Sequence, residues 1–374
     1  MEMKAKRLSI LHVGNHTIPC IGGIENVIWE SSKEQLRAGN GVEIVVFNTC
    51  TKGTTLPAYE EKEGVKIHRV PQKGFSFYRV PPLPEFLQYA QGKDIVHVHG
   101  FGGWLEAACR TKKKHSALIV LNTHGGFRHT TERSILKWVY QTFFLPSLLK
   151  KVDGIICDSP SDQTFVENFS YKTKIIPNGI SSEFFAQAKT KKDKNQWLFV
   201  GRLSRNKRVD RLLETLAHYP SFQKITLHIV GDNWEGLQKG LEQRAKELGI
   251  DSRVRFHGKV SDETRMKLFA KCGIFLSASE YEGFGISAIE ATAAGCIPVL
   301  NCIPSFEHFA SQTKGIIITD FSNPINAAKD IQKVMDARAS SIQFMKNELR
   351  AFAAEYDWKI IVGNQLEYYR RLSP

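Results

Sequence analysis

Short apolar runs alternate with longer helical patterns along nearly the whole sequence of 374 residues. We expect strands at 8–13, 42–47, 65–70, 94–99, 117–122, 154–157, 197–200, 225–230, 254–257, 274–277, 297–300 and 315–318. We expect helices between them, among them 24–38, 104–113, 132–151, 160–168 and 286–294. Several strand runs are apolar throughout, as parallel strands covered on both faces must be. The alternation therefore predicts an α/β fold with parallel, doubly wound sheets.

The alternation is interrupted at residues 181–196, which are polar, rich in lysine and without a clear period. A fresh apolar run, WLFVG, follows at once. The chain is also about two to three times as long as a typical domain. We therefore expect two Rossmann-like domains joined near residue 185, with a ligand in the cleft between them. Open α/β sheets bind ligands at the carboxyl ends of their strands, so the loops that follow the strands should carry the chemistry.

Seven cysteines are scattered at positions 20, 50, 109, 157, 272, 296 and 302, with no CxxC and no metal-ligand spacing. An odd, scattered set suits a reducing compartment and gives no disulfide framework. The apolar run near the N-terminus is too short for a signal peptide. No run approaches the ~18 residues of a membrane span. We expect a soluble, cytoplasmic protein.

The formal net charge of +13 is spread over both halves of the chain. Such a surface attracts phosphate-bearing partners or an anionic membrane face, although an ordinary basic surface explains the charge as well. Residues 138–151 mix aromatic side chains with flanking cations, among them Arg128 and Arg133. This pattern is typical of an amphipathic surface that meets anionic lipid headgroups. A core helix with polar ends explains it equally well.

Two loops with glycines follow strands in the first half. Gly22 and Gly23 open a helix, where backbone N–H groups and the helix dipole favour a phosphate, but a tight turn is the alternative. The dinucleotide fingerprint GxGxxG is absent there. His124 ends a strand in NTHGGFRHT, and its imidazole or its backbone carbonyl could bond a polar substrate near the reaction centre. A lone histidine is more often structural, yet this position favours a site. The phrase PNGI at 177–180 indicates only a turn.

Two cations follow the first strand of the second half, in VGRLSRNKRVD. Arg202 and Lys207 stand in this loop after Gly201, and a guanidinium fork beside an ammonium suits two neighbouring phosphates. If a phosphate ester is the leaving group, these cations stabilise its developing charge without a metal ion. A solvated loop is the alternative.

The stretch 278–300 joins an acidic, glycine-bearing loop to a helix of small residues. Glu282 lies in the loop and Glu290 lies on the helix eight residues later. Glycosidase carboxyls lie roughly 5–9.5 Å apart, whereas eight helical residues span about 12 Å. Separate roles on one elongated ligand therefore fit the two carboxylates better than a glycosidase pair. Gly283 and Gly285 offer backbone N–H groups to an anion at the helix N-terminus.

Taken together, these motifs resemble a known family. The pair of glutamates with seven residues between them is similar to the E-x7-E signature of family 4 retaining glycosyltransferases of the GT-B fold. GGIE, THGG, PNGI and GRLSRNK occur in that family's order and spacing, so the resemblance covers nearly the whole chain. THGGFRHT and SEYEGFGISAIEATAAGCIPVL resemble most the exopolysaccharide mannosyltransferases, which use GDP-mannose and extend a lipid-diphosphate-linked oligosaccharide at the inner membrane face.

The resemblance implies a role for each matching position. The implied donor-binding residues are Gly22, Gly23, Gly201, Arg202, Lys207, Glu282, Gly283, Phe284, Gly285, Ile286 and Glu290. The implied catalytic residues are His124, Arg202, Lys207 and Glu282. His124 would contact the donor sugar near its anomeric carbon, the two cations would hold the diphosphate, and Glu290 would bond the ribose. Arg128 departs from the aromatic usual in that subgroup and is the candidate acceptor contact.

The resemblance also implies an architecture of two Rossmann-like domains whose parallel sheets face a central cleft. Residues 1–185 would bind the acceptor and residues 186–355 the nucleotide sugar. Residues 356–374 would cross back to the first domain, with 365–371 as the crossing helix. Neither a metal ion nor a cofactor is expected.

We therefore expect a retaining glycosyltransferase that moves a hexose, best mannose from GDP-mannose, to a hydroxyl of a lipid-linked glycan. It would associate peripherally with the cytoplasmic membrane face and bind no nucleic acid. A UDP-sugar donor or a nucleotide-sugar epimerase is the alternative. A dehydrogenase has only GFGISA in its favour, and a polyanion-binding module leaves Glu282 and Glu290 unexplained.

Overall fold

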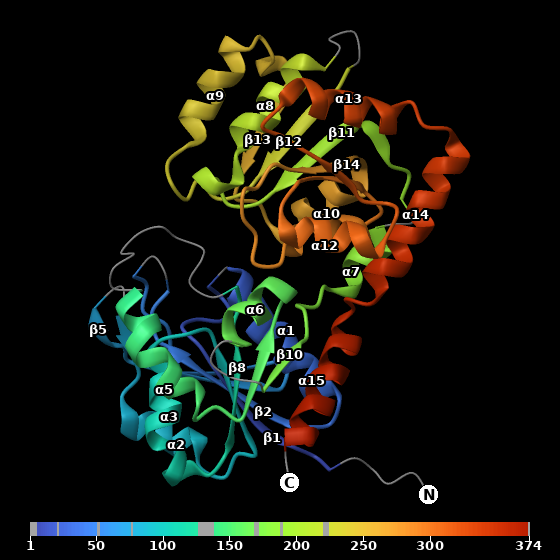
Figure 1. The fold of residues 1–374 in the computed structure, drawn as a ribbon. Helices are drawn as coiled ribbons and strands as arrows, with labels where there is room; N and C mark the ends of the chain where they lie inside the picture. Colours follow the sequence, from blue (N-terminus) through green and yellow to red (C-terminus); the bar gives the residue numbers. More distant parts are fainter. Residues whose placement is uncertain are drawn as a thin grey trace, which may run out of the picture. The chain divides into compact units, whose positions relative to one another are not determined.

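The computed structural model describes residues 6–20, 22–50, 53–75, 78–125, 138–167, 172–187, 190–219 and 224–372. Its contacts divide the chain into two compact units (Figure 1). Unit 1 comprises Met1–Gly179 and Trp358–Pro374, and unit 2 comprises Ile180–Asp357. The sequence placed the boundary at residue 185, inside α7 (Ser182–Gln187), which packs on α10 (Asp262–Lys271) and α11 (Ile286–Ala293) of unit 2. Within the described ranges, no helix combines the length and the apolarity that crossing a bilayer requires.

Unit 1 contains an eight-stranded sheet with the order β10-β9-β8-β7-β1-β2-β4-β3, in which only the edge strand β3 is antiparallel to its neighbour. The strands are β1 (Ser9–Val13), β2 (Gly41–Phe47), β3 (Tyr59–Lys62), β4 (Val65–Val70), β7 (Ile95–His99), β8 (Leu118–Asn122), β9 (Gly154–Cys157) and β10 (Thr173–Ile175). A hairpin of β5 (Lys73–Phe75) and β6 (Tyr78–Val80) lies outside this sheet. All six strands expected in this half are present. The sequence missed β3, β5, β6 and β10, which are only three or four residues long and therefore lack an apolar run.

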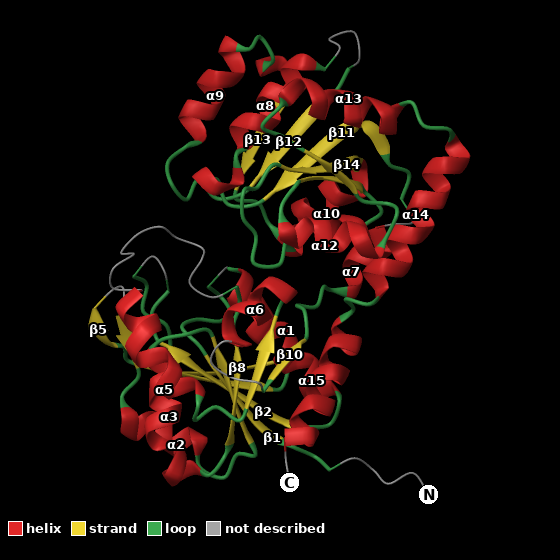
Figure 2. Cartoon of the chain, in the orientation of Figure 1, coloured by secondary structure: helices red, strands yellow, loops and turns green. Residues whose placement is uncertain are grey.

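Helices cover both faces of the unit 1 sheet (Figure 2). One layer holds α2 (Leu83–Ala90), α3 (Gly103–His115) and α5 (Leu145–Leu149), and α6 (Pro160–Glu167) packs beside β9 and β10. The other holds α1 (Gly23–Arg37) and α15 (Trp358–Leu372), which pack on each other. The helix expected over 132–151 is a π-helical turn, η1 (Tyr140–Phe144), followed by α5; residues 132–137 lie outside the described ranges.

Unit 2 contains a six-stranded, wholly parallel sheet with the order β13-β12-β11-β14-β15-β16. The strands are β11 (Asp193–Val200), β12 (Thr226–Val230), β13 (Val254–Gly258), β14 (Cys272–Ser277), β15 (Ile297–Asn301) and β16 (Ile317–Thr319). The remaining helices are α8 (Val209–His218), α9 (Gln238–Glu247), α12 (Pro304–Gln312), α13 (Pro324–Met335) and α14 (Ala339–Ala354), with short 3-10 turns η2 (Arg205–Lys207) and η3 (Asp251–Arg253). All six expected strands are present; β11 begins four residues before its apolar core, in polar residues that are partly exposed.

The six central strands of both units follow the Rossmann order 3-2-1-4-5-6. In unit 2 the order reverses between β11 and β14, and in unit 1 it reverses between β1 and β7. Ligands of open α/β sheets bind at the carboxyl ends of the strands at such switch points. The fold therefore identifies the loops after these strands as the places to look for chemistry.

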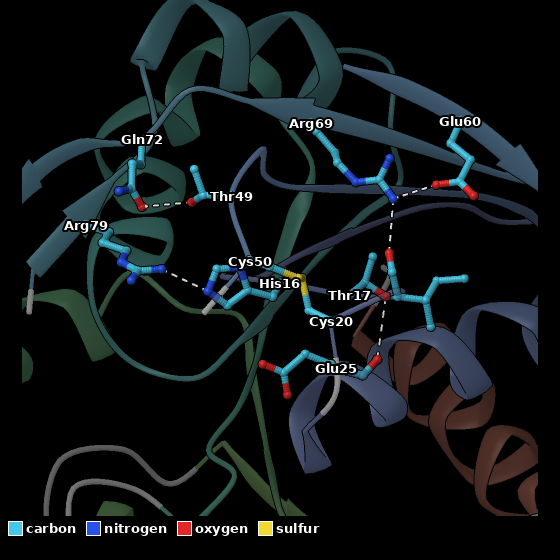
Figure 3. Close-up of a disulfide and its surroundings, with 11 residues drawn as sticks. His16, Thr17, Cys20, Glu25, Thr49, Cys50, Glu60, Arg69, Gln72 and Arg79 are labelled. Carbon is cyan, nitrogen blue, oxygen red and sulfur yellow. Dashed lines mark hydrogen bonds and ion pairs between the residues drawn. A yellow bond between two sulfur atoms is a disulfide. The ribbon is translucent and has the colours of Figure 1, made fainter. Parts of the chain in front are cut away.

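One sequence inference about the cysteines was wrong, because Cys20 and Cys50 form a disulfide (Figure 3). The two residues are 30 positions apart, a spacing that resembles no motif. They follow β1 and β2, which are parallel neighbours, so their loops leave the same sheet edge and bring the Cα atoms to 5.6 Å. Beside the disulfide, Arg69 donates to the Ile18 carbonyl and to the Glu60 carboxylate (Figure 3).

Candidate functional site

The switch point of unit 2 holds an ion pair between Lys207 and Glu282. Lys207 Nζ lies 2.6 Å from Glu282 Oε1, and the two side chains are 16% and 13% exposed. Ser279 Oγ donates to the same carboxylate oxygen at 2.8 Å. The loop after β11 and the loop after β14 are also joined through the backbone, because the Asn206 carbonyl accepts from Glu280 N at 2.8 Å. The structure thus joins two predicted site residues that are 75 positions apart in sequence.

Arg202 lies in the same loop after β11, but its contact is different. Its guanidinium carbon lies 5.2 Å from the centre of the Trp234 ring, which is 54% exposed in the loop after β12. This loop approaches closely because Gly231 packs on Gly201; a Cβ at Gly231 would lie 1.7 Å from the Gly201 carbonyl oxygen. A cation over an aromatic face is held by the ring quadrupole. Arg202 is therefore oriented by an aromatic ring, whereas Lys207 is oriented by a carboxylate.

The neighbouring arginine in this loop is neutralised. Arg208 bonds Asp210 at 2.8 Å and Glu280 at 2.6 Å, and these bonds raise the pKa of its guanidinium. Glu280 also pairs with Arg211. Two carboxylates bond Arg208, whereas one bonds Lys207 and Arg202 lies over an aromatic ring, so Arg208 has the least positive charge left to offer an anionic ligand.

The N-terminus of α11 follows the Glu282 loop, as expected from Gly283, Phe284, Gly285 and Ile286. Gly285 is the N-cap, with φ +99°, a left-handed conformation that glycine adopts without strain. A Cβ there would also lie 2.7 Å from the Phe306 ring. Phe284 is buried against Phe309 and fixes the loop to the core. The glycine cap leaves the helix N-terminus with its dipole as a place for negative charge.

Glu290 lies on α11 in a different environment. It is buried, and both of its carboxylate oxygens bond Arg265 of α10, at 3.2 and 3.3 Å. Burial raises the pKa of Glu290 despite that guanidinium. The structure therefore pairs Glu290 with Arg265, and its contact with a ribose stays a prediction.

In unit 1, Gly22 and Gly23 lie at the N-terminus of α1. Gly22 is the N-cap in an extended conformation and Gly23 is the first helical residue. The turn after β1 that leads into a helix is thus present, and the phosphate contact of these glycines stays a prediction. Arg128, the candidate acceptor contact, lies outside the described residues.

His124 follows β8 and turns its side chain into the protein. The side chain is 4% exposed, Nδ1 lies 3.3 Å from Asp158 Oδ2, and Nε2 lies 2.9 Å from His99 Nδ1. The backbone is left-handed, with φ +48°. Since both ring nitrogens are hydrogen-bonded, the arrangement favours the backbone carbonyl over the imidazole as the group that meets a substrate.

Sequence reasoning missed the partners that hold His124. Asp158 follows β9, and Asn178 of the PNGI segment donates to Asp158 Oδ2 at 2.8 Å. Asp162 accepts from the hydroxyl of Thr123 and from Gly125 N, and burial raises its pKa. A polar residue directly after the expected strand at 154–157 was a readable signal for Asp158. The role of Asn178 was not readable, because its motif indicates only a turn.

Three buried histidines, His12, His97 and His99, lie close enough to be considered as metal ligands. His12 Nδ1 and His99 Nε2 are 2.8 Å apart, whereas two nitrogens on a tetrahedral zinc ion lie about 3.3 Å apart. His12 Nε2 is also bonded to Gln35 Oε1 at 2.8 Å. The contact between His12 and His99 is therefore that of two hydrogen-bonded rings, closer together than two nitrogens on one zinc ion.

The surface expected to face lipid is described from residue 138 onward. Trp138, Phe143 and Phe144 are 59%, 65% and 58% exposed, whereas Leu145 and Leu149 are buried in the core of unit 1. The segment is therefore amphipathic, with its aromatic side chains outward and its leucines inward.

Comparisons with known proteins cover most of the chain. Residues 21–184 match the family described as "Glycosyltransferase Family 4", and residues 181–350 match "Glycosyl transferases group 1". A GDP-mannose:cellobiosyl-diphosphopolyprenol alpha-mannosyltransferase of Xanthomonas oryzae pv. oryzae is 29% identical, over 97% of this chain and 96% of the relative. A protein of the same name from Komagataeibacter xylinus is 24% identical, over 98% and 93%.

Solved structures resemble the whole chain as well. Sucrose-phosphate synthase from Thermosynechococcus elongatus has a TM-score of 0.76 at 18% identity and covers 98% of this chain and 99% of its own. An Anabaena protein, HepE, in complex with UDP and glucose has a TM-score of 0.74 at 18% identity, over 96% and 99%. At such identities the likeness shows the fold alone, namely two Rossmann-like units in one chain.

Proposed function

Because the chain belongs to the family 4 retaining glycosyltransferases of the GT-B fold, we propose that it transfers mannose from GDP-mannose to a hydroxyl of a lipid-diphosphate-linked glycan. The observation that carries this proposal is the Lys207–Glu282 pair at the switch point of unit 2. The names of the two mannosyltransferases, whose similarity spans the full chain, support the donor and the acceptor.

The pair suits a ligand that has a diphosphate beside a sugar. An ammonium and a carboxylate in contact offer one group to phosphate oxygens and the other to sugar hydroxyls. Because Lys207 neutralises Glu282, the carboxylate can lie near the diphosphate with little repulsion. Arg202, held over Trp234, is the second cation for the diphosphate, and the N-terminus of α11 adds its dipole.

The proposed reaction is a front-face displacement. The bond between the anomeric carbon and the diphosphate oxygen breaks, and the acceptor oxygen bonds the same carbon from the same face. The acceptor hydroxyl gives its proton to the departing diphosphate. Lys207 and Arg202 stabilise the charge that develops there, so the step is proposed to need no metal ion.

We further propose that unit 1 associates peripherally with an anionic membrane, where a lipid-linked acceptor resides. The exposed Trp138, Phe143 and Phe144 would enter the headgroup region, and the nearby Lys150 and Lys151 would attract its charge. Flotation with vesicles that contain anionic lipid tests this. A variant with alanine at all three aromatic positions should float less. Vesicle binding that does not change with salt concentration would contradict the proposal.

Calorimetric titration with GDP, UDP, ADP and NAD in EDTA tests the donor. We expect tight, selective binding of GDP, followed by mannose transfer that depends on an acceptor. A preference for UDP would keep the enzyme class and overturn the donor. Release of free nucleotide without an acceptor would indicate an epimerase instead, and binding of NAD alone would contradict the proposal altogether.

A further inference from the structure

A row of buried, hydrogen-bonded side chains crosses unit 1 from α15 to the residue that follows β9. In order it contains Gln365, Gln35, His12, His99, His124 and Asp158. The successive distances are 2.9, 2.8, 2.8, 2.9 and 3.3 Å. His12 lies on β1 and His99 on β7, the strands that flank the switch point. Gln35 lies on α1 and Gln365 on α15.

The contacts at the α15 end of the row determine which atoms along it donate and which accept. Gln35 Nε2 donates to Gln365 Oε1 at 2.9 Å and to Tyr369 Oη at 3.4 Å. The amide oxygen of Gln35 therefore faces His12 Nε2. An amide oxygen can only accept, so His12 Nε2 carries a hydrogen and donates.

The next two rings are neutral, so each has one donor and one acceptor nitrogen. Burial lowers the pKa of His12 to about 4 and holds the pKa of His99 well below its usual value. With its hydrogen on Nε2, His12 accepts at Nδ1 from His99 Nε2. His99 in turn accepts at Nδ1 from His124 Nε2. His12 and His99 therefore both donate from Nε2 toward Gln35 and accept at Nδ1 from the ring that follows.

At His124 the row meets a carboxylate. The Nε2 hydrogen of His124 is already donated to His99, and its Nδ1 lies 3.3 Å from Asp158 Oδ2. That oxygen also accepts from Asn178. Without a further proton, two acceptors would face each other in a buried place, where unpaired polar groups are costly.

We propose that Gln35, His12 and His99 are positioning residues that keep an additional proton between His124 Nδ1 and Asp158 Oδ2. His124 is then an imidazolium paired with a carboxylate, and both side chains are at most 4% exposed. Two charge-assisted hydrogen bonds hold such a ring more firmly than neutral ones do. They fix the left-handed backbone of His124 and, with it, the orientation of the His124 carbonyl directly after β8.

The opposite set of hydrogen bonds, with every donor and acceptor exchanged, would need no additional proton. In it every ring donates from Nδ1 toward Asp158, and His124 is neutral. The oxygen of Gln35 opposes this direction, because it would then face the lone pair of His12 Nε2. A Gln35→Leu variant removes that restraint, so it should reverse all three rings together although it alters only the first of them.

NMR of the full-length protein with 15N-labelled histidine reads these hydrogens directly. We expect His12 and His99 with hydrogen on Nε2 alone and His124 with hydrogen on both nitrogens. Asp158→Asn should make His124 neutral and leave His12 and His99 unchanged. In Gln35→Leu all three rings should carry hydrogen on Nδ1. Three rings with Nδ1 hydrogens in the unaltered protein would overturn the proposal, as would stoichiometric zinc bound to these nitrogens.

Unit 2 supplies a matched control. There His228 Nε2 bonds Gln196 Oε1 at 2.8 Å and His228 Nδ1 bonds His257 Nε2 at 2.8 Å, the same arrangement without a link to His124. Gln196→Leu should change the rings of His228 and His257 alone. A change of His124 in this variant would mean that the signal reports general loosening and would count against the proposal.

The effect on activity rests on the proposed function, whereas the NMR result does not. Gln35→Leu should lower kcat about 10–100-fold with little change in KM, as when partners that orient metal-ligating histidines are removed. Gln196→Leu should leave both constants unchanged. If Gln35→Leu moved the hydrogens of the three rings to Nδ1 and left kcat unchanged, the positioning role would be overturned. If the unaltered protein showed the expected ring hydrogens but transferred no mannose, the donor proposal would be overturned instead.

Discussion

The two units share one sheet order and place different chemistry at the switch point. In unit 2 the loops carry charged side chains in contact, as in the Lys207–Glu282 pair. In unit 1 the residues beside the switch point are buried rings, such as His12 and His99, that meet through hydrogen bonds. Topology therefore determines where a site lies, and loop or core composition determines what it can do.

Removing the charge in unit 2 should have the largest effect. Lys207→Ala should lower turnover ~10²–10³-fold, because it removes one group that stabilises the departing diphosphate. Steady-state kinetics with GDP-mannose measures the loss. The fold should remain, since the side chain lies in a loop and is partly exposed.

Lys267→Ala is the control for this variant. Lys267 also pairs with a glutamate, Glu263, but on an exposed helix face. We expect no change in its turnover. A loss below about threefold in Lys207→Ala would contradict the role of this ammonium.

The disulfide distinguishes the units covalently. Reduction of Cys20–Cys50 should lower the unfolding free energy of unit 1 by about 3.6 kcal/mol, the loop-closure entropy for a separation of 30 residues, and leave unit 2 unchanged. Hydrogen exchange with and without reductant resolves the two units. Cys302→Ser, at an exposed free cysteine, is the control. Equal loosening of both units would contradict a local role for the bond.

Mild acid should also act mainly on unit 1. Burial lowers the pKa values of His12, His97 and His99, so the unfolded chain binds protons below about pH 6.5 that the folded unit does not bind. Stability is therefore complete above that pH and falls as the pH falls. Between pH 7 and 6 each histidine lowers the unfolding free energy of unit 1 by about 0.7 kcal/mol, which makes about 2 kcal/mol for the three. Unit 2, with His228 and His257 shifted the same way, should lose less. Hydrogen exchange at both pH values checks this, and an equal loss in both units would contradict it.

The same contrast explains how much the sequence revealed. The apolar strands, the Lys207 loop and the Glu282 loop were predictable, because apolar runs and charged loop residues are local signals, whereas the short strands β3, β5, β6 and β10 were not. The contact of Lys207 with Glu282 follows once β11 and β14 are neighbours. The row through His12 and His99 was not predictable, because it depends on register between β1 and β7 and on the side chains of two distant helices. The disulfide was missed for the same reason: it depends on strand neighbours and not on spacing.

The smallest effect concerns the aromatic ring that orients Arg202. Trp234→Ala should raise KM for the donor about 2–5-fold with little change in kcat, because an exposed cation–π contact contributes about 0.5–1 kcal/mol. Trp138→Ala removes a similarly exposed tryptophan from unit 1 and should leave this KM unchanged, while vesicle binding weakens. If both variants shifted KM equally, the ring in unit 2 would have no special relation to the donor. If Trp234→Ala lowered kcat instead, Arg202 would act mainly on the departing diphosphate in the transition state and less on the bound donor.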